Sequence, residues 1–349
     1  MNKARAGNYF EDFAQGQVFQ HGTPKTLGDG DRTLYTALYG SRFAHHQSDE
    51  FARMIGYPRT PIDDLLVFHM IFGKTVNDIS LNAIANLGYA DCRFATPVYS
   101  GDTLSARSEV IGIKENSDGK SGTVYVRSKG VNQKGDIVLD FVRWVMVRKR
   151  NEKIAAQQEE VPQLREAVEA EALGRSCPAI NVSSWDWSAG GSTARFSDYE
   201  IGERIDHIDG ATVEEAEHMM AARLYHNNAR VHFNAWQESK GRFGRRIVYG
   251  GHVMSLARAL SFNGLANAFH LAAINGGRHV APLFAGSTVF AWSQIRDKAL
   301  LAGRADVGAL RVLTRATRDM PAGGFPLERA KEGAPGVILE FDYWALIPV

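Results

Sequence analysis

The chain has only two cysteines, Cys92 and Cys177, among its 349 residues. Without a second pair, neither a disulfide framework nor a thiolate zinc site can be built, and a reducing cytoplasm is the expected compartment. A long apolar run is also missing. The stretch 65–72 is far shorter than the roughly 20 residues that span a bilayer, and residues 1–20 lack the apolar segment of a signal peptide. We therefore expect no membrane role.

An excess of charge of one sign is missing as well. The 40 Lys and Arg residues are balanced by 39 Asp and Glu residues, which argues against a nucleic acid as the partner. A hydrophobic fraction of 44% and a charged fraction of 23% are ordinary for a globular protein, so disorder, collagen and coiled coil are excluded. At this length, two domains of similar size are expected.

Several catalytic signatures do not occur in the sequence: GxxxxGK[ST], GxSxG, HExxH and CxxC. These motifs position the groups needed for phosphoryl transfer, for serine hydrolase chemistry and for zinc hydrolysis. Their absence disfavours all three reaction classes.

The sequence does contain an internal repeat. Residues 10–16 read FEDFAQG and residues 196–202 read FSDYEIG, and a histidine follows each segment after five positions. The spacing of 186 also links His46 to His232, and residues 93–103 (RFATPVYSGDT) match residues 278–288 (RHVAPLFAGST) at a spacing of 185. Ordered matches with almost no drift predict a tandem duplication of a unit of about 150 residues. We expect repeats at 1–150 and 193–349, joined by a linker at 151–192 that carries one surface helix around 161–173.

Each repeat shows short elements, one long helix and then a run of strands. Residues 212–215 (TVEE) form a capping box for a helix that reaches about Arg223. Asp63 and Asp64 are expected to cap a wholly buried helix over 65–72, and Gly250 and Gly251 precede an apolar stripe at positions 253, 256, 257 and 260. Strand-like segments lie at 103–112, 122–130 and 137–148, and at 288–295, 309–317 and 337–346. A sheet wrapped around one helix satisfies this order, so the predicted fold class is α+β.

A histidine-centred segment in each repeat is the main candidate for chemistry. The first has Ser41 five positions before His46, and the second has Asn227 five positions before His232. The spacing resembles the Gly-Asp-x-Asn-Pro-x-His segment of MaoC-like, R-specific enoyl-CoA hydratases, whose downstream His-Gly pair is matched here by Tyr249-Gly250.

Longer stretches are similar to one group of that superfamily, the mesaconyl-CoA hydratases or β-methylmalyl-CoA dehydratases. They are residues 82–89 (NAIANLGY), 143–149 (RWVMVRK) and 249–264 (YGGHVMSLARALSFNG). The resemblance covers nearly the whole chain and implies a tandem (double) hot-dog fold. It implies a hydro-lyase of the ethylmalonyl-CoA pathway that reversibly hydrates mesaconyl-CoA to β-methylmalyl-CoA. It further implies a CoA-thioester substrate, no metal or redox cofactor, a cytoplasmic location and association into a homo-oligomer.

The acid/base pair departs from the family pattern, because Ser41 and Asn227 stand where the family has aspartate. Asparagine can orient water or an imidazole but cannot take a proton at neutral pH. His232 is therefore the expected acid/base group, assisted by Asn227, although a structural histidine is the alternative. Five residues of continuous helix would turn these two side chains about 140° apart, so they can cooperate only if the helix ends between them.

The two repeats differ at the start of the long helix. Gly250 and Gly251 leave amide N–H groups open at a helix N-terminus, where an enolate oxygen is favoured. Carboxylates at Asp63 and Asp64 would cap those amides and repel an enolate. We therefore expect the C-terminal repeat to be catalytic and the N-terminal repeat to be mainly architectural. His252, next to the glycines, is either catalytic or a hydrogen-bond donor within the helix terminus.

A mesaconyl group carries a free carboxylate, which a bidentate arginine recognises well. Arg230 is the first candidate for this role and Arg278 the second, with Tyr249 as a further substrate-binding residue; either arginine is otherwise part of a structural ion pair. A basic cluster is a candidate for binding the phosphates of coenzyme A, or else is a solvated face. It consists of Lys240, Arg242, Arg245 and Arg246.

Two alternatives remain open on the sequence alone. One is a hydratase or thioesterase for another acyl-CoA on the same fold, which the lack of a carboxylate-binding arginine in the pocket would favour. The other is a non-catalytic acyl-CoA-binding hot-dog protein, which the loss of both family aspartates suggests.

Overall fold

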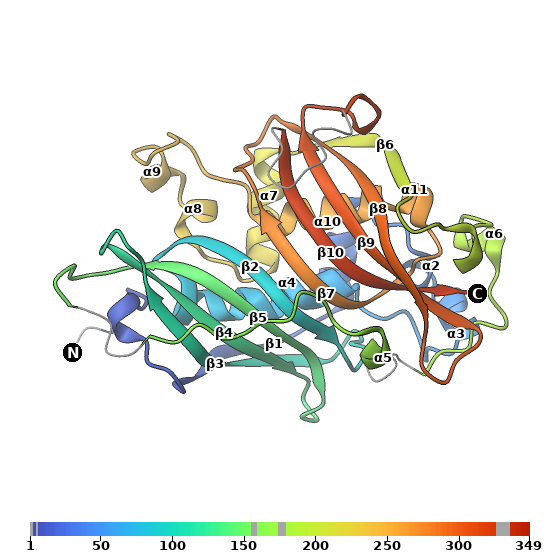
Figure 1. Ribbon diagram of the computed structural model, residues 1–349, viewed down its shortest axis with the longest axis horizontal. Coiled ribbons are helices and arrows are strands. Elements are labelled where there is room, and N and C mark those ends of the chain that lie inside the picture. The colour runs from blue at the N-terminus through green and yellow to red at the C-terminus, as the bar shows by residue number, and fades with distance from the viewer. Residues whose placement is uncertain (1–2, 5, 155–158, 174–178, 326–335) are drawn as a thin grey trace.

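The computed structural model of the chain contains one continuous antiparallel sheet (Figure 1). The structure describes residues 3–4, 6–154, 159–173, 179–325 and 336–349. Within them ten strands follow the order β1-β3-β4-β5-β2-β7-β10-β9-β8-β6, so the two halves of the chain meet at β2 and β7. The strands are β1 (Val18–Thr26), β2 (Ala83–Phe94), β3 (Thr103–Glu115), β4 (Ser121–Val131), β5 (Ile137–Arg148), β6 (Arg204–Thr212), β7 (His270–His279), β8 (Thr288–Leu300), β9 (Val307–Arg318) and β10 (Val337–Pro348).

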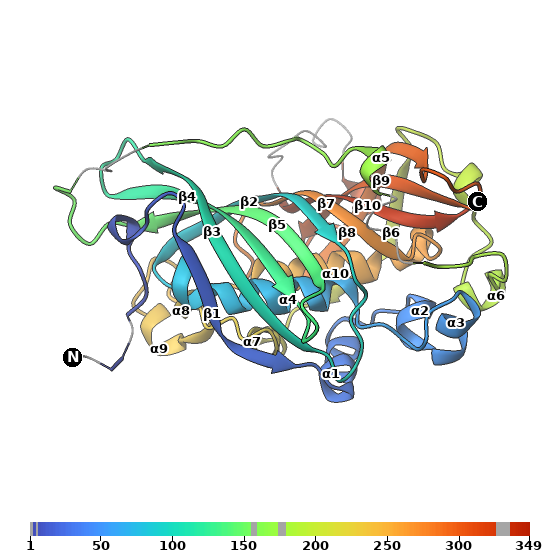
Figure 2. The same ribbon diagram turned by 90° about the horizontal axis from the view of Figure 1, so that it is seen from below.

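Each half of the sheet wraps around one buried helix. All twelve residues of α4 (Asp64–Thr75) are buried, as predicted from a run that is apolar on every side. Helix α10 (Gly250–Leu260) buries Val253, Leu256 and Ala257, which confirms the predicted stripe. Figure 2 shows both helices lying beneath the sheet. The six strand-like segments predicted from the sequence all form strands, namely β3, β4, β5, β8, β9 and β10.

The duplication is visible in buried side-chain contacts. In the N-terminal half, His21 Nε2 lies 2.7 Å from Ser108 Oγ, and this hydroxyl is hydrogen-bonded to a serine on β4. In the C-terminal half, His207 Nε2 lies 2.7 Å from Ser293 Oγ, which is hydrogen-bonded to a threonine on β9. The matched sequence positions therefore occupy matched places in space.

The histidine-containing segments extend across the boundary between the halves. Helices α2 (Ala44–Gln47) and α3 (Asp49–Met54) lie beside the C-terminal half, where the His45 ring contacts Phe269 at 5.1 Å between centroids. Helices α8 (Arg230–Phe233) and α9 (Ala235–Glu238) lie beside the N-terminal half (Figure 1), where Arg230 Nη1 donates to Asn82 Oδ1 at 2.9 Å. Each site is therefore built from both repeats.

The other helical segments are η1 (Phe10–Asp12), α1 (Asp29–Tyr39), the π-helical η2 (Val76–Ser80), α6 (Trp187–Gly190), η3 (Phe196–Asp198), α11 (Phe262–Leu265) and η4 (Ala322–Gly324).

The predicted linker helix around 161–173 is wrong over most of its length, because only α5 (Ala170–Leu173) is helical. Contacts with the sheet hold the preceding residues outside helical conformation. Glu160 N donates to Ile113 O at 2.9 Å, and the Val168 carbonyl accepts from the Trp344 indole at 3.0 Å. Tertiary hydrogen bonds here outweigh local helix propensity.

The predicted start of the next helix is also displaced. Thr212 is the last residue of β6, and its hydroxyl lies 2.8 Å from that of Thr288. Helix α7 (Glu215–Leu224) begins after Glu214, whose N–H is accepted by the Glu217 carboxylate at 3.2 Å. The glutamates therefore cap this helix, while Thr212 belongs to the sheet.

Cys92 is buried on β2 with its thiol free, and Cys177 lies outside the described residues. None of the helices in the described ranges combines the length and apolar character needed to cross a bilayer.

Candidate active site

A break between two helices positions His232. Helix α7 ends at Leu224, and His226 adopts a positive φ of 55° that redirects the chain. Asn227 follows in a turn, where its Oδ1 accepts from Ala229 N at 3.2 Å, and α8 then begins at Arg230. No continuous helix joins Asn227 to His232, which is the condition for these two side chains to cooperate.

The His232 ring has a defined tautomer. Nδ1 lies 2.9 Å from the Ile247 carbonyl oxygen, which can only accept a hydrogen bond, so the proton of the neutral ring is on Nδ1. Nε2 therefore carries the free lone pair. Burial lowers the pKa of His232 to about 4, so that the ring is an unprotonated base at neutral pH.

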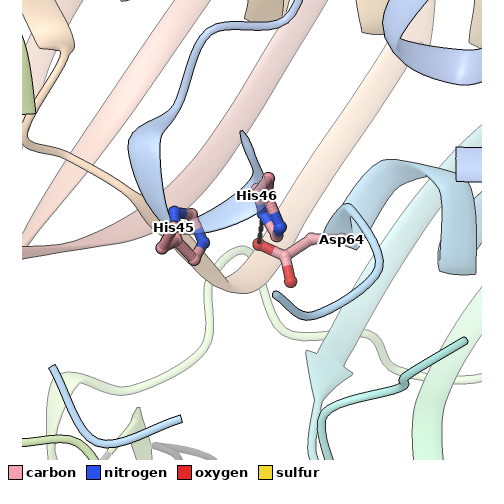
Figure 3. A group of neighbouring side chains, drawn as sticks. All are labelled: His45, His46 and Asp64. Carbon is pink, nitrogen blue, oxygen red and sulfur yellow. Dashed lines mark ion pairs between the residues drawn. The ribbon is translucent and has the colours of Figure 1, made fainter. Parts of the chain in front are cut away.

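The N-terminal repeat shows where this Nε2 points. His46 Nδ1 lies 3.2 Å from the Pro61 carbonyl, and His46 Nε2 faces Asp64 Oδ2 at 3.7 Å (Figure 3). Pro61 and Asp64 each lie 186 positions before Ile247 and Gly250, respectively. From this correspondence we infer that Nε2 of His232 points towards the start of α10, where glycine replaces the carboxylate, and the His232 ring indeed lies 5.4 Å from the ring of Tyr249, the N-cap residue of α10.

The start of α10 is uncapped. Tyr249, the N-cap residue, provides no side-chain hydrogen bond, and the described residues include no acceptor for the amides of Gly250 and Gly251. A Cβ at position 250 would overlap the His279 ring, and one at position 251 would overlap the His69 ring. Both positions therefore require glycine. Two open amides at a helix N-terminus, next to an unprotonated imidazole, can bind a developing oxyanion.

The matching place in the N-terminal repeat is closed. Asp63 accepts from Leu65 N at 2.9 Å and so caps α4. Asp64 accepts from Leu271 N at 2.8 Å and lies 3.1 Å from His270 Nδ1. The adjoining cavity, lined by Asp64 and His270, is about 20 Å³, which is room for no more than a water molecule.

The closed site is a network of charges. Burial alone would raise the pKa of Asp64, but the charges and hydrogen bonds of His270 and His46 hold it well below its usual value. The ligand atoms of His45, His46 and Asp64 lie within 4.8 Å of one another, a spacing that a cation could bridge. The Asp64 carboxylate is nevertheless already satisfied by the Leu271 amide and by imidazole groups.

We call the region around His232 and the uncapped amides of Gly250 and Gly251 the open site; two further residues beside it were not predicted from the sequence. His279 is the last residue of β7, and its ring lies against Gly250. Its Nε2 is 3.2 Å from the hydroxyl of Tyr89 on β2. Burial, with His232 nearby, lowers the pKa of His279 to about 4. Both lie in stretches noted in the sequence, 82–89 and 278–288, but nothing in those stretches marks the two as neighbours, because only the pairing of β2 with β7 brings them together.

The remaining predicted residues have other partners. His252 Nδ1 lies 2.9 Å from the hydroxyl of Tyr39 on α1, so this ring links α10 to the N-terminal repeat. Arg230 donates to Asn82 Oδ1, as described above, and Arg278 Nη2 pairs with Glu340 at 3.0 Å. Acceptors of the protein itself thus engage both candidate arginines.

The buried neutral imidazoles predict a pH-dependent stability. Burial is the main cause of their low pKa values, whereas the unfolded chain titrates near 6.5. Because the unfolded chain then binds more protons, the free energy of unfolding should be highest above about pH 6.5 and should fall as the pH drops towards 4. Urea unfolding at pH 7.5, 6 and 5 tests this, and a flat profile would contradict it. The groups are His69 and His252, with pKa values of about 3, and His207, His232 and His279, with values of about 4.

Comparison with known proteins gives consistent matches. A family model described as mesaconyl-CoA hydratase matches residues 1–318. The β-methylmalyl-CoA dehydratase of Chloroflexus aurantiacus is 56% identical over 348 residues, covering 99% of this chain and 98% of that protein. The mesaconyl-CoA hydratase of Cereibacter sphaeroides is 52% identical over 349 residues, covering 99% of both.

Solved structures agree on the architecture. A crystal structure of a MaoC domain protein from Chloroflexus aurantiacus has a TM-score of 0.96 and 56% identity, over 100% of this chain and 99% of that one. A Mycobacterium tuberculosis protein with a double hot-dog fold has a TM-score of 0.72 and 26% identity, over 99% of both chains. The tandem hot-dog fold expected from the sequence is confirmed.

Proposed function

The chain belongs to the mesaconyl-CoA hydratase family, and we propose that it catalyses the reversible hydration of mesaconyl-CoA to β-methylmalyl-CoA at the open site of its C-terminal repeat. One contrast carries the choice of site: the His232 ring lies 5.4 Å from the ring of Tyr249, the residue before the uncapped start of α10, whereas its counterpart His46 faces the carboxylate of Asp64. An enolate is stabilised in the first case and repelled in the second.

The reaction follows from these groups. The amides of Gly250 and Gly251 hold the thioester carbonyl oxygen and draw electrons from the conjugated double bond. His232 Nε2 removes a proton from water as the oxygen attacks the β-carbon, and the negative charge moves to the thioester oxygen. The proton held by His232 then passes to the α-carbon. One water molecule has been added, and the imidazole is neutral again.

Three other predicted residues act around this centre. Asn227 is a positioning residue, since its side chain shapes the turn that leads into α8. His252 positions α10 through its contact with Tyr39. Tyr249 lies beside the reacting group, with its ring 5.4 Å from that of His232. In this proposal the C-terminal repeat supplies the catalytic groups, while the N-terminal repeat supplies part of the wall, including Tyr89.

The segment that follows α8, made of α9 and the residues up to 246, is suited to hold coenzyme A. Trp236 is 72% exposed, and the ammonium of Lys240 lies 3.5 Å from its ring centroid. Arg245 stacks on Phe284 at 4.1 Å, within the 278–288 segment. Exposed aromatic rings and cations can bind an adenine ring and phosphates together. Arg246 is paired with Glu215 and is less available.

Replacing Arg245 by alanine should therefore raise KM for mesaconyl-CoA by about tenfold and change kcat by less than about twofold, because the ground state and the transition state lose the same binding energy. Steady-state kinetics with mesaconyl-pantetheine provide the control, since that thioester lacks the nucleotide. An equal rise in KM for both thioesters would place the nucleotide elsewhere.

The activity itself can be tested by the loss of ultraviolet absorbance when the conjugated enoyl thioester is hydrated. Pure protein should consume mesaconyl-CoA until equilibrium and should form the same mixture from β-methylmalyl-CoA. Turnover of crotonyl-CoA without turnover of mesaconyl-CoA would instead identify a hydratase for another acyl-CoA. Turnover of neither would contradict a hydratase function.

A further inference from the structure

A buried arginine on β5 has no counter-ion among the residues that the structure describes. Arg143 is 0% exposed. Its Nη2 donates to Thr75 Oγ1 at 2.6 Å, and both terminal nitrogens lie 3.4 Å from Ser80 Oγ. Its Nε has no hydrogen-bond partner, and no carboxylate of the described residues pairs with it. Burial lowers the pKa of Arg143 to about 10, so the group still carries its charge at neutral pH.

Other buried arginines of the described chain are satisfied. Arg315 donates to the Glu340 carboxylate at 3.0 Å. Arg258 donates to the carbonyl oxygens of Ala268 and Phe269, which directly precede β7. A buried charge that lacks such partners is destabilising. Arg143 is therefore poorly explained by a role in stability, whereas an anionic ligand would supply the missing partner.

The guanidinium lies near the open site. Arg143 is directly opposite Tyr89 on β2, the residue whose hydroxyl meets His279. The guanidinium is 4.2 Å from the ring centroid of Phe72, and that ring lies 5.9 Å from the ring of Tyr249. The Phe72 ring thus lies between the charge of Arg143 and Tyr249, the residue that precedes α10.

A second unsatisfied polar group lies on the same face of the sheet. Asn86 is opposite Val145, which is two residues from Arg143, and directly opposed residues share one face. Both amide atoms of Asn86 are buried, and no group in the described ranges bonds to them. The guanidinium of Arg143 and the side-chain amide of Asn86 both have N–H donors without an acceptor, so this pair is suited to bind a carboxylate, and we call it the carboxylate cradle.

The C-terminal repeat lacks this cradle. Residues 141–144 of β5 read FVRW and residues 341–344 of β10 read FDYW, so Tyr343 replaces Arg143. The Tyr343 hydroxyl is satisfied by Thr314 Oγ1 at 3.1 Å. The arginine is therefore present only in the N-terminal half of the sheet, the half over which α8 lies (Figure 1).

We propose that Arg143, together with Asn86, binds the free carboxylate that the β-carbon of mesaconyl-CoA carries, and that this subsite selects dicarboxylic over neutral acyl thioesters. The inference rests on the function proposed above. In this proposal the thioester oxygen lies on the amides of Gly250 and Gly251, the β-carbon faces His232, and the carboxylate on the β-carbon points towards Arg143.

The test uses two unreactive saturated thioesters, methylsuccinyl-CoA and 2-methylbutyryl-CoA, which differ by a carboxylate in place of a methyl group. Calorimetric titration of the wild-type protein should show about 100-fold tighter binding of methylsuccinyl-CoA. Arg143→Met should reduce this preference to about threefold or less by weakening only the dicarboxylic ligand. Arg143→Lys keeps the charge but loses the paired N–H donors of the guanidinium, so it should retain about a tenth of the wild-type preference.

The controls separate recognition from folding. Arg127→Met, on neighbouring β4 and paired with Asp140, should leave both dissociation constants unchanged. Arg143→Met should unfold at the same or a higher temperature, because a buried unpaired charge is removed. If either Arg143 variant keeps the full preference, or weakens both ligands equally, the inference is overturned. If the preference behaves as expected but mesaconyl-CoA is not hydrated, the subsite stands and the proposed reaction falls.

Discussion

Replacing His232 by alanine is expected to lower kcat for mesaconyl-CoA hydration by about 1000-fold or more, because this imidazole both takes the proton from water and returns it to the α-carbon. Its Nδ1 is fixed by the Ile247 carbonyl, and its Nε2 carries the free lone pair. No other group described at the open site combines this tautomer with this orientation. The absorbance change of the enoyl thioester measures the loss.

The matched control is His226→Asn. His226 is an exposed residue of the same segment with a positive φ, which asparagine tolerates. This variant should retain the wild-type kcat and unfolding temperature. Wild-type activity in His232→Ala would exclude this residue as the base and would direct attention to His279.

Replacing Asp64 by alanine should lower the free energy of unfolding by about 3–5 kcal/mol, because a buried charge network loses its anionic centre. The variant leaves the Leu271 amide and the rings of His46 and His270 without their acceptor. Urea unfolding at neutral pH measures the loss.

Asp63→Ala provides the comparison: Asp63 caps the helix and accepts a long hydrogen bond of 3.4 Å from Ser41 Oγ, so its removal should cost about 1 kcal/mol. The kcat of folded Asp64→Ala protein should stay close to the wild-type value if the N-terminal site has no catalytic role. A large fall in kcat with unchanged stability would assign catalysis to the N-terminal repeat instead.

Much of the architecture could be predicted from the sequence because it is encoded twice. Matched spacings predicted two similar halves, and continuous apolar runs predicted the buried helix α4 and the strands that follow it. The prediction of a linker helix was wrong because the backbone of Glu160 and Val168 is hydrogen-bonded to the sheet. Such contacts depend on the whole fold and leave no local pattern.

The candidate site was predictable only in part. His232, Gly250 and Gly251 lie at fixed spacings that a family resemblance can reveal. Tyr89 and Arg143 meet through the pairing of β2 with β5, and His279 joins Tyr89 only when the two halves pair across β2 and β7. The sequence instead favoured Arg230, whose position beside His232 in the chain suggested proximity. The folded protein uses that arginine to anchor α8 through Asn82.

The contrast between Asp64 and Gly250 also bears on how such a molecule can diversify. In a homodimer, one coding position determines both symmetry-related sites, so a residue that strengthens one copy must also occupy the other. Within one duplicated chain the two helix starts are encoded separately. The aspartate network can then rigidify the start of α4 while the start of α10 keeps its free amides. A mutation at one helix start leaves the residue at the other unchanged.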